Sequence, residues 1–114
     1  MEAEERHLLI VEDDDAFART LQRSFERRGW VVLRAADIEQ ARALAVEHAP
    51  GHAVVDLKLA HGAPGLACVQ LLHEHDADMV IVVLTGYASI ATAVEAIKLG
   101  ARHYLAKPAN TDDI

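Results

Sequence analysis

Four consecutive carboxylates follow an aliphatic run near the start of the chain. The stretch "LLIVEDDDAF" covers residues 8–17 and places Glu12, Asp13, Asp14 and Asp15 directly after its aliphatic part. Like charges at the end of a buried segment repel one another, and a cation or a proton relieves that repulsion. The alternative interpretation is a solvated turn that caps the following helix, because acidic residues favour helix N-termini.

Three more residues that can do chemistry each follow another aliphatic run. Asp56 lies in "VVDLKL", Thr85 in "LTGY" and Lys107 in "AKP". Together with Glu12 and Asp13, they supply three carboxylates, a hydroxyl and an amine. These are the groups that a divalent cation and a phosphoryl group would require.

This set of residue types suits metal-assisted phosphoryl transfer. Mg²⁺ takes oxygen ligands and is usually bound by one or two carboxylates together with waters and a substrate phosphate. We expect Asp13 and Asp56 to bind it directly and Glu12 to act through water. An aspartate can attack phosphorus to give an acyl phosphate, and the transfer depends on positioning and charge neutralisation. The Lys107 ammonium would neutralise phosphoryl oxygens, and the Thr85 hydroxyl would donate a hydrogen bond to them.

Five short apolar runs must position these residues, and we expect each to be a strand. They cover residues 7–11, 30–35, 52–55, 79–84 and 103–106. Several are nearly continuous in aliphatic residues, as in strands buried on both faces of a parallel sheet. Helical patterns separate them, which predicts an α/β fold with a doubly wound, five-stranded parallel sheet and helices on both faces. Ligands in such folds bind beyond the carboxyl ends of the strands, where the residues above would converge.

Local signals mark the helices between these strands. Gly29 ends the first helix, and Asp37 with Gln40 resembles a capping box that opens the second. Apolar residues at helical spacing place the third and fourth helices around residues 66–72 and 91–98. The last five residues, "NTDDI", look like the beginning of a fifth helix with Thr111 as its N-cap, so we expect that helix to be truncated.

Composition excludes several classes of protein. A chain of 114 residues is long enough for one domain but not two. Its net charge of −7 opposes direct nucleic-acid binding, which needs clustered Lys and Arg. No apolar run approaches the ~20 residues of a membrane span, and the acidic start "MEAEERH" is not a signal peptide. A single cysteine cannot form an internal disulfide, which fits a reducing compartment.

The motifs "IVEDD", "VVDLKL", "LTG" and "HYLAKP", in this order, resemble the receiver domain of bacterial two-component response regulators. The stretch "LTGYASIATAVEAIKLGARHYLAKPA" further resembles redox and photosynthesis regulators of the RegA/PrrA type. The resemblance covers essentially the whole chain. It implies a flavodoxin-like strand order 2-1-3-4-5, and a receiver domain over residues 1–114 that forms the N-terminal part of a longer regulator.

The resemblance also implies which residues hold the metal and the phosphoryl group. Asp56 becomes the phosphoacceptor, and Glu12 and Asp13 become an acid pair beside it. The implied Mg²⁺ ligands are Glu12, Asp13, Asp56 and the backbone carbonyl of Lys58.

Three other residues gain roles from the same resemblance. Thr85 and Tyr104 become a switch pair, and Lys107 becomes the phosphate-binding lysine. Taken alone, Thr85 would more often be a helix cap or turn former, and Tyr104 a half-buried strand aromatic. Their positions after the fourth strand and within the fifth favour the switch.

The function implied is a phosphorylation-activated signalling switch in the cytoplasm, without a membrane anchor. A sensor histidine kinase would donate the phosphoryl group, and a DNA-binding output domain outside this chain would respond. The domain would not be an enzyme beyond Mg²⁺-dependent self-phosphorylation and self-dephosphorylation. The alternatives are a Mg²⁺-dependent phosphatase with an aspartyl nucleophile and a docking module without phosphorylation. The first lacks a second acid near Asp56 in "LKLAHGAPG", and the intact acid pair with Asp56 and Lys107 opposes the second.

Truncation of the fifth helix would bare parts of the first and fifth strands. We therefore expect reduced stability, self-association over that face, or a longer chain. Two motifs are interpreted as structural. "HEHDAD" (73–78) is a solvated helix end, because residues two apart on a helix do not face each other. Cys68 is a packed thiol rather than a redox sensor.

Overall fold

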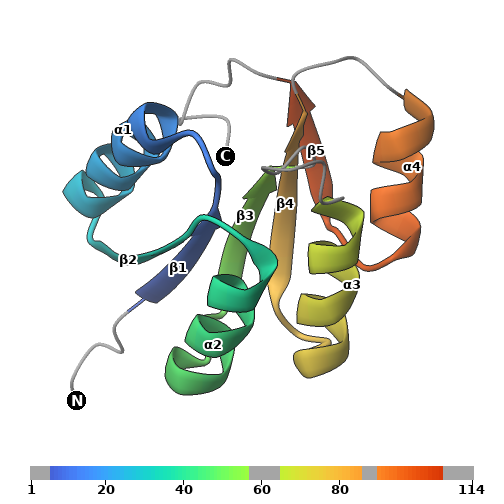
Figure 1. The fold of residues 1–114 in the computed structure, drawn as a ribbon, viewed down its shortest axis with the longest axis horizontal. Helices are drawn as coiled ribbons and strands as arrows, with labels where there is room; N and C mark the ends of the chain where they lie inside the picture. The colour runs from blue at the N-terminus through green and yellow to red at the C-terminus, as the bar shows by residue number, and fades with distance from the viewer. Residues whose placement is uncertain (1–5, 57–64, 86–89, 107–114) are drawn as a thin grey trace.

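The computed structural model describes residues 6–56, 65–85 and 90–106, and these form one parallel five-stranded sheet with helices on both faces (Figure 1). The strand order is β2-β1-β3-β4-β5. The strands are β1 (Arg6–Val11), β2 (Trp30–Ala35), β3 (His52–Asp56), β4 (Val80–Thr85) and β5 (His103–Ala106). The helices are α1 (Asp15–Arg27), α2 (Ile38–His48), α3 (Gly65–His75) and α4 (Ile90–Lys98). The predicted doubly wound sheet and its order 2-1-3-4-5 are confirmed.

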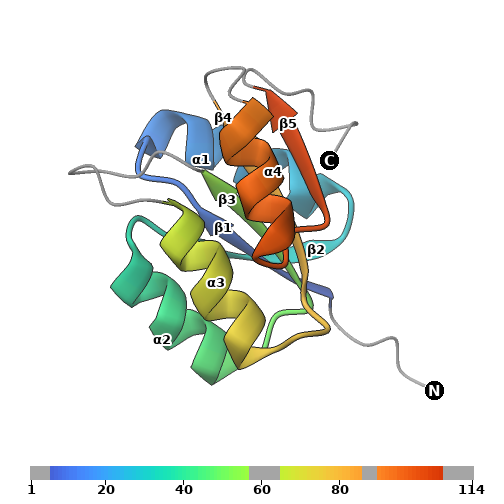
Figure 2. The same ribbon diagram turned by 90° about the vertical axis from the view of Figure 1, so that its right-hand side faces the viewer.

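The four helices are divided unequally between the two faces of the sheet. Helices α2, α3 and α4 lie side by side on one face, and α1 lies on the other (Figure 2). Alternate side chains of a strand point to opposite faces. Leu9 and Val11 of β1 therefore join the core under α2 and α3, whereas Leu8 and Ile10 join the core under α1. The inner strands β1 and β3 are thus buried from both sides, as their aliphatic sequences predict, whereas the edge strand β2 is only partly buried.

Side-chain caps fix where α1 and α2 begin. The Asp14 carboxylate accepts a hydrogen bond from the backbone N–H of Phe17 at 3.1 Å. The Asp37 carboxylate accepts from the backbone N–H of Gln40 at 2.8 Å. Gln40 closes this capping box one residue further back than the usual pattern, because its Oε1 accepts from the N–H of Ala36 at 2.8 Å. The predicted capping box is therefore present in a modified form.

The ends of the other elements agree with the sequence to within one residue at most positions. Gly29, with φ of +90°, directly follows the α1 C-cap residue. The fourth strand begins at Val80 rather than at Met79, because the Met79 N–H donates to the Asp76 carbonyl in the preceding turn at 3.1 Å. The predicted beginning of a fifth helix, residues 110–114, lies outside the described residues. Among the described helices, none is long and apolar enough to cross a membrane.

The sheet face that α1 covers also carries an apolar hollow. It has a volume of about 160 Å³ and lies between α1 and residues of all five strands. Its lining includes Leu8, Phe25 and Trp30, together with His52 and His103. Burial and the nearby Arg6 charge lower the pKa of His52. Within the described part of the chain, α1 is the helix that packs on this face.

Candidate metal centre

Three carboxylates meet at the carboxyl ends of the two central strands. Glu12 and Asp13 follow β1, and Asp56 is the last residue of β3. The parallel register pairs Val11 with Val55, so the two strands end side by side. One carboxylate oxygen from each of Glu12, Asp13 and Asp56 lies within 4.8 Å of the others. The predicted convergence of these three residues is thus present.

Two of these three carboxylates are buried. Glu12 and Asp56 are each 4% exposed, whereas Asp13 is exposed. The Glu12 backbone is fixed to the neighbouring strand, because its N–H donates to the Ala35 carbonyl at 2.9 Å. Gathering negative charges away from water is costly unless a positive charge or a proton compensates. A cluster of carboxylate oxygens with one exposed side is suited to a hard divalent cation.

The acidic run that follows β1 divides into two functional pairs. Glu12 and Asp13 belong to the carboxylate cluster, while Asp14 caps α1 and Asp15 is the first residue of that helix. The helix-cap interpretation is thus confirmed for Asp14, while Glu12 and Asp13 lie where a cation site would need them.

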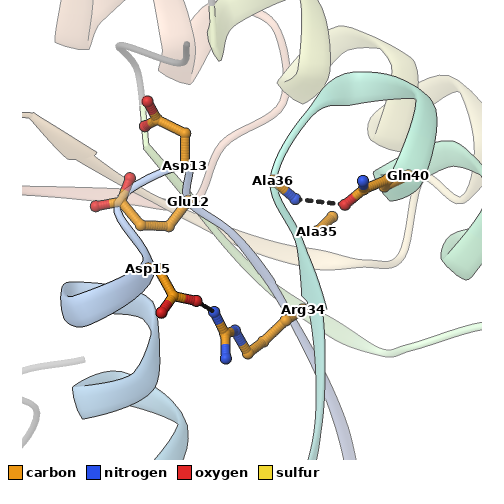
Figure 3. Close-up of a pocket in the computed structure, with 7 residues that line it drawn as sticks. All are labelled: Glu12, Asp13, Asp15, Arg34, Ala35, Ala36 and Gln40. Carbon is orange, nitrogen blue, oxygen red and sulfur yellow. Dashed lines mark hydrogen bonds and ion pairs between the residues drawn. The ribbon is translucent and has the colours of Figure 1, made fainter.

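A polar pocket of about 340 Å³ opens beside the cluster, between the β1–α1 loop and the end of β2 (Figure 3). Glu12 and Asp13 line one part of it, and Asp15, Arg34 and Gln40 line the rest. Arg34 Nη2 donates to Asp15 Oδ1 at 2.5 Å, and Arg19 forms a second ion pair with the same carboxylate. These two guanidinium groups, Arg34 foremost, lower the pKa of Asp15.

Arg34 and Asp15 were not among the residues that the sequence singled out for the site. A signal was present, however. The run "WVVLRA" carries one charged residue, and that residue stands next to the end of the second strand, at the same edge as the other candidates. Arg34 therefore follows the same placement rule that identified Asp56 and Thr85.

Two of the remaining predicted site residues lie on β4 and β5. Thr85 is the last residue of β4 and pairs with Ala106 of β5. Tyr104 pairs with Val83 and is 47% exposed, so it is a roughly half-buried strand aromatic. Lys58 and Lys107 lie outside the described residues.

The two motifs interpreted as structural have different surroundings. Cys68 is fully buried, and burial raises the pKa of its thiol to about 12. It is a packed thiol, as predicted. His73 differs from the solvated helix end that was expected: its Nδ1 is buried, without a hydrogen-bond partner among the described residues, and its ring lies against Gly100. Within the described ranges, Glu12, Asp13 and Asp56 are the one group of His, Cys, Asp or Glu side chains placed to hold a metal.

A 2-1-3-4-5 parallel sheet with carboxylates gathered at the ends of its central strands defines a receiver-type signalling domain. The chain belongs to the response regulator receiver domain family, whose sequence profile matches residues 8–114.

Two groups of curated relatives are most informative about this chain. The photosynthetic apparatus regulatory protein RegA of Cereibacter sphaeroides is 46% identical over 110 residues, which is 96% of this chain and 59% of RegA. The acid tolerance regulatory protein ActR of Rhizobium meliloti is 48% identical over 110 residues, which is 96% of this chain and 56% of ActR. The predicted similarity to RegA-type regulators is confirmed. The chain spans less than two thirds of the length of these relatives.

Solved structures of similar proteins agree with the fold. A response regulator from Burkholderia pseudomallei, crystallised with a phosphorylated aspartic acid, calcium and citrate, has a TM-score of 0.91 and 44% identity. The similarity covers 96% of this chain and 64% of that one. A CheY-like receiver domain from Methanospirillum hungatei has a TM-score of 0.90 and 29% identity, covering 96% of this chain and 87% of that one.

Proposed function

We propose that this domain accepts a phosphoryl group on Asp56 from a histidine kinase and thereby switches the activity of a response regulator. The observation that carries the proposal is the position of Asp56, a buried carboxylate at the end of β3 within 4.8 Å of two other carboxylates. Family membership supports it, as does the phosphorylated aspartic acid of the Burkholderia relative.

The donor set fits a divalent cation of the Mg²⁺ type. Three carboxylates supply the hard oxygen ligands that this ion takes, and the exposed side at Asp13 leaves room for waters and a phosphoryl oxygen. Glu12, Asp13 and Asp56 would hold the ion, with the backbone carbonyl of Lys58 as a further proposed ligand. When bound, Mg²⁺ supplies positive charge that neutralises the phosphoryl oxygens.

Different residues of the chain would then have different roles in phosphoryl transfer. An Asp56 carboxylate oxygen attacks phosphorus, the bond from phosphorus to the donor imidazole breaks, and an acyl phosphate forms on Asp56. The Lys107 ammonium and the Thr85 hydroxyl bind oxygens of the transferred group. The position of Thr85 at the end of β4, two strands from Glu12, supports its share in this site.

Switching would involve Thr85 and Tyr104. Thr85 closes β4, and Tyr104 lies on the adjacent β5, paired with Val83 two residues before Thr85. If the Thr85 hydroxyl moves to the phosphoryl group, it vacates space that the Tyr104 ring can enter. Because Tyr104 is 47% exposed, such a movement would alter the surface that α4 and β5 present to partners.

The proposed partners follow from the family and from the length of the relatives. A sensor histidine kinase is the proposed donor. A longer regulator, with a transcriptional output domain outside these 114 residues, is the proposed context, since RegA and ActR extend well beyond the matched region. We propose a cytoplasmic location on the same grounds. We also propose that the domain can self-associate over the sheet face that carries the apolar hollow beside α1. Sedimentation would test this.

Phosphorylation can be tested directly. The chain is incubated with acetyl phosphate and Mg²⁺, and its mass is measured. We expect one added phosphoryl group on the natural chain and none on Asp56→Asn, which keeps the shape of the side chain but cannot form the acyl phosphate. Asp76→Asn, in the turn between α3 and β4 at the opposite edge of the sheet from the cluster, serves as the matched control and should be labelled normally. Equal labelling of the Asp56→Asn chain would contradict the assignment.

A further inference from the structure

Arg34 is a fixed positive charge beside the carboxylate cluster. It lies on β2, where it pairs in register with Ile10, and the next residue, Ala35, binds the Glu12 N–H through its carbonyl. The Arg34 guanidinium enters the same pocket that Glu12 and Asp13 line (Figure 3). A guanidinium is always charged, and it binds carboxylates well. It is therefore a potential competitor of any cation that the cluster binds.

Contacts from α1 hold this guanidinium. Asp15 accepts from Nη2 at 2.5 Å, and Gln22 Oε1 accepts from Nη1 at 3.4 Å. Figure 3 shows the Arg34 side chain directed to Asp15, while the Glu12 and Asp13 carboxylates point elsewhere in the pocket. Asp15 also pairs with Arg19, one helical turn away, so its own position is fixed by a second contact.

This ion pair contributes little to the stability of the fold. The Asp15 side chain is 65% exposed and the Arg34 side chain 33% exposed, and exposed ion pairs contribute little to folding. The location of the pair at the edge of the metal centre matters more. Removing Asp15 would leave Arg34 without its main anchor, within the pocket that two metal-binding carboxylates share.

We propose that Asp15 is a positioning residue that holds the Arg34 guanidinium away from Glu12 and Asp13 and so keeps the carboxylate cluster available to a divalent cation. This inference rests on the proposed function only in taking the cluster as the cation site. Its consequence concerns the equilibrium affinity for Mg²⁺, independently of phosphorylation.

A double-mutant cycle separates positioning from simple charge. Mg²⁺ affinity is measured by NMR titration of the 114-residue chain and of Asp15→Asn, Arg34→Gln and the double variant. If only charge mattered, Asp15→Asn would weaken binding by the same factor whether or not Arg34 is present. If Asp15 positions Arg34, we expect a loss of roughly tenfold when Arg34 is present and at most about threefold in the Arg34→Gln background.

Controls give each result a definite meaning. Glu47→Gln removes one exposed carboxylate near the end of α2, away from Arg34, and we expect it to change Mg²⁺ affinity by less than about twofold, since exposed charges at that distance are screened. Circular dichroism checks that each variant is folded. Equal losses from Asp15→Asn in both backgrounds would overturn the inference and leave the proposed function intact. Absence of Mg²⁺ binding by the natural chain would contradict the metal centre itself, and this inference with it.

Discussion

Cys68 illustrates how strongly the fold changes the chemistry of a single side chain. It lies on α3 in the core beneath α2, fully buried, with the pKa of its thiol raised to about 12 by burial. The thiolate is the reactive form of cysteine, and at pH 8 almost none is present in the folded chain. Burial also blocks the approach of a reagent, so both factors act in the same direction.

We therefore expect Cys68 to resist alkylation while the chain is folded. Iodoacetamide at pH 8 should label the native chain at least about a hundredfold more slowly than the chain in urea, where the thiol returns to an ordinary pKa near 8.5. Mass spectrometry over time would measure both rates. Rapid labelling of the native chain would instead indicate an accessible, redox-sensitive thiol.

The turn after α4 shows how one element constrains its neighbour. Gly100 has φ of +124°, a conformation that side chains with a Cβ rarely adopt, and an added Cβ would meet the His73 ring on α3. The Ala101 N–H donates back to the Ala96 carbonyl at 3.0 Å, which closes the helix in this conformation. The end of α4 thus rests against α3 with no space for a side chain between them.

Substitution at this turn should cost stability for both reasons. We expect Gly100→Ala to lower the free energy of unfolding by about 2–4 kcal/mol, from backbone strain and the clash with His73. Gly51→Ala is the matched control, because a Cβ there meets no atom within 4 Å, and its effect should stay within about 0.5 kcal/mol. Urea denaturation of both variants would measure the difference. Similar losses in the two would show that the His73 contact is unimportant.

The elements that the sequence predicts well are those whose signals are local. Aliphatic runs located all five strands, and Asp37 and Gly29 marked helix ends, because period, caps and turn residues act within a few positions. The carboxylate cluster was also predictable, since parallel strands must place their carboxyl ends together. The ion pair between Asp15 and Arg34 was not, because it depends on how α1 is oriented over β2. The buried Nδ1 of His73 was missed for a similar reason, because it depends on the approach of the turn after α4.

If the proposed metal centre binds Mg²⁺, the stability of the whole domain should increase with the Mg²⁺ concentration. A ligand that binds only the folded state stabilises it by RT ln(1 + [L]/Kd), which is about 1.4 kcal/mol at ten times Kd. We expect a rise in the melting temperature of roughly 5 °C for a chain of this size, measured against NaCl at equal ionic strength. Calorimetry with and without EDTA gives the comparison.

Asp13→Ala should change the stability of the domain both without and with Mg²⁺. Without metal, the variant should be as stable as the natural chain or more so, because one of three mutually repelling carboxylates is gone. Addition of Mg²⁺ should raise the stability of the variant only slightly, because one carboxylate ligand of the ion has been removed. A variant stabilised by Mg²⁺ as much as the natural chain would show that Asp13 does not bind the ion.

The register between β1 and β3 has a consequence for how the chain folds. Glu12 and Asp56 are far apart in the sequence and meet only because Val11 pairs with Val55. Parallel strands need a long connection between them, here α1, β2 and α2, so the carboxylates come together only when segments far apart in the sequence have paired. Partly folded chains that keep a local helix or a single strand contain no cation site. Mg²⁺ should therefore slow the global opening of the molecule and leave the fraying of individual helices unchanged, a difference that hydrogen exchange would resolve residue by residue.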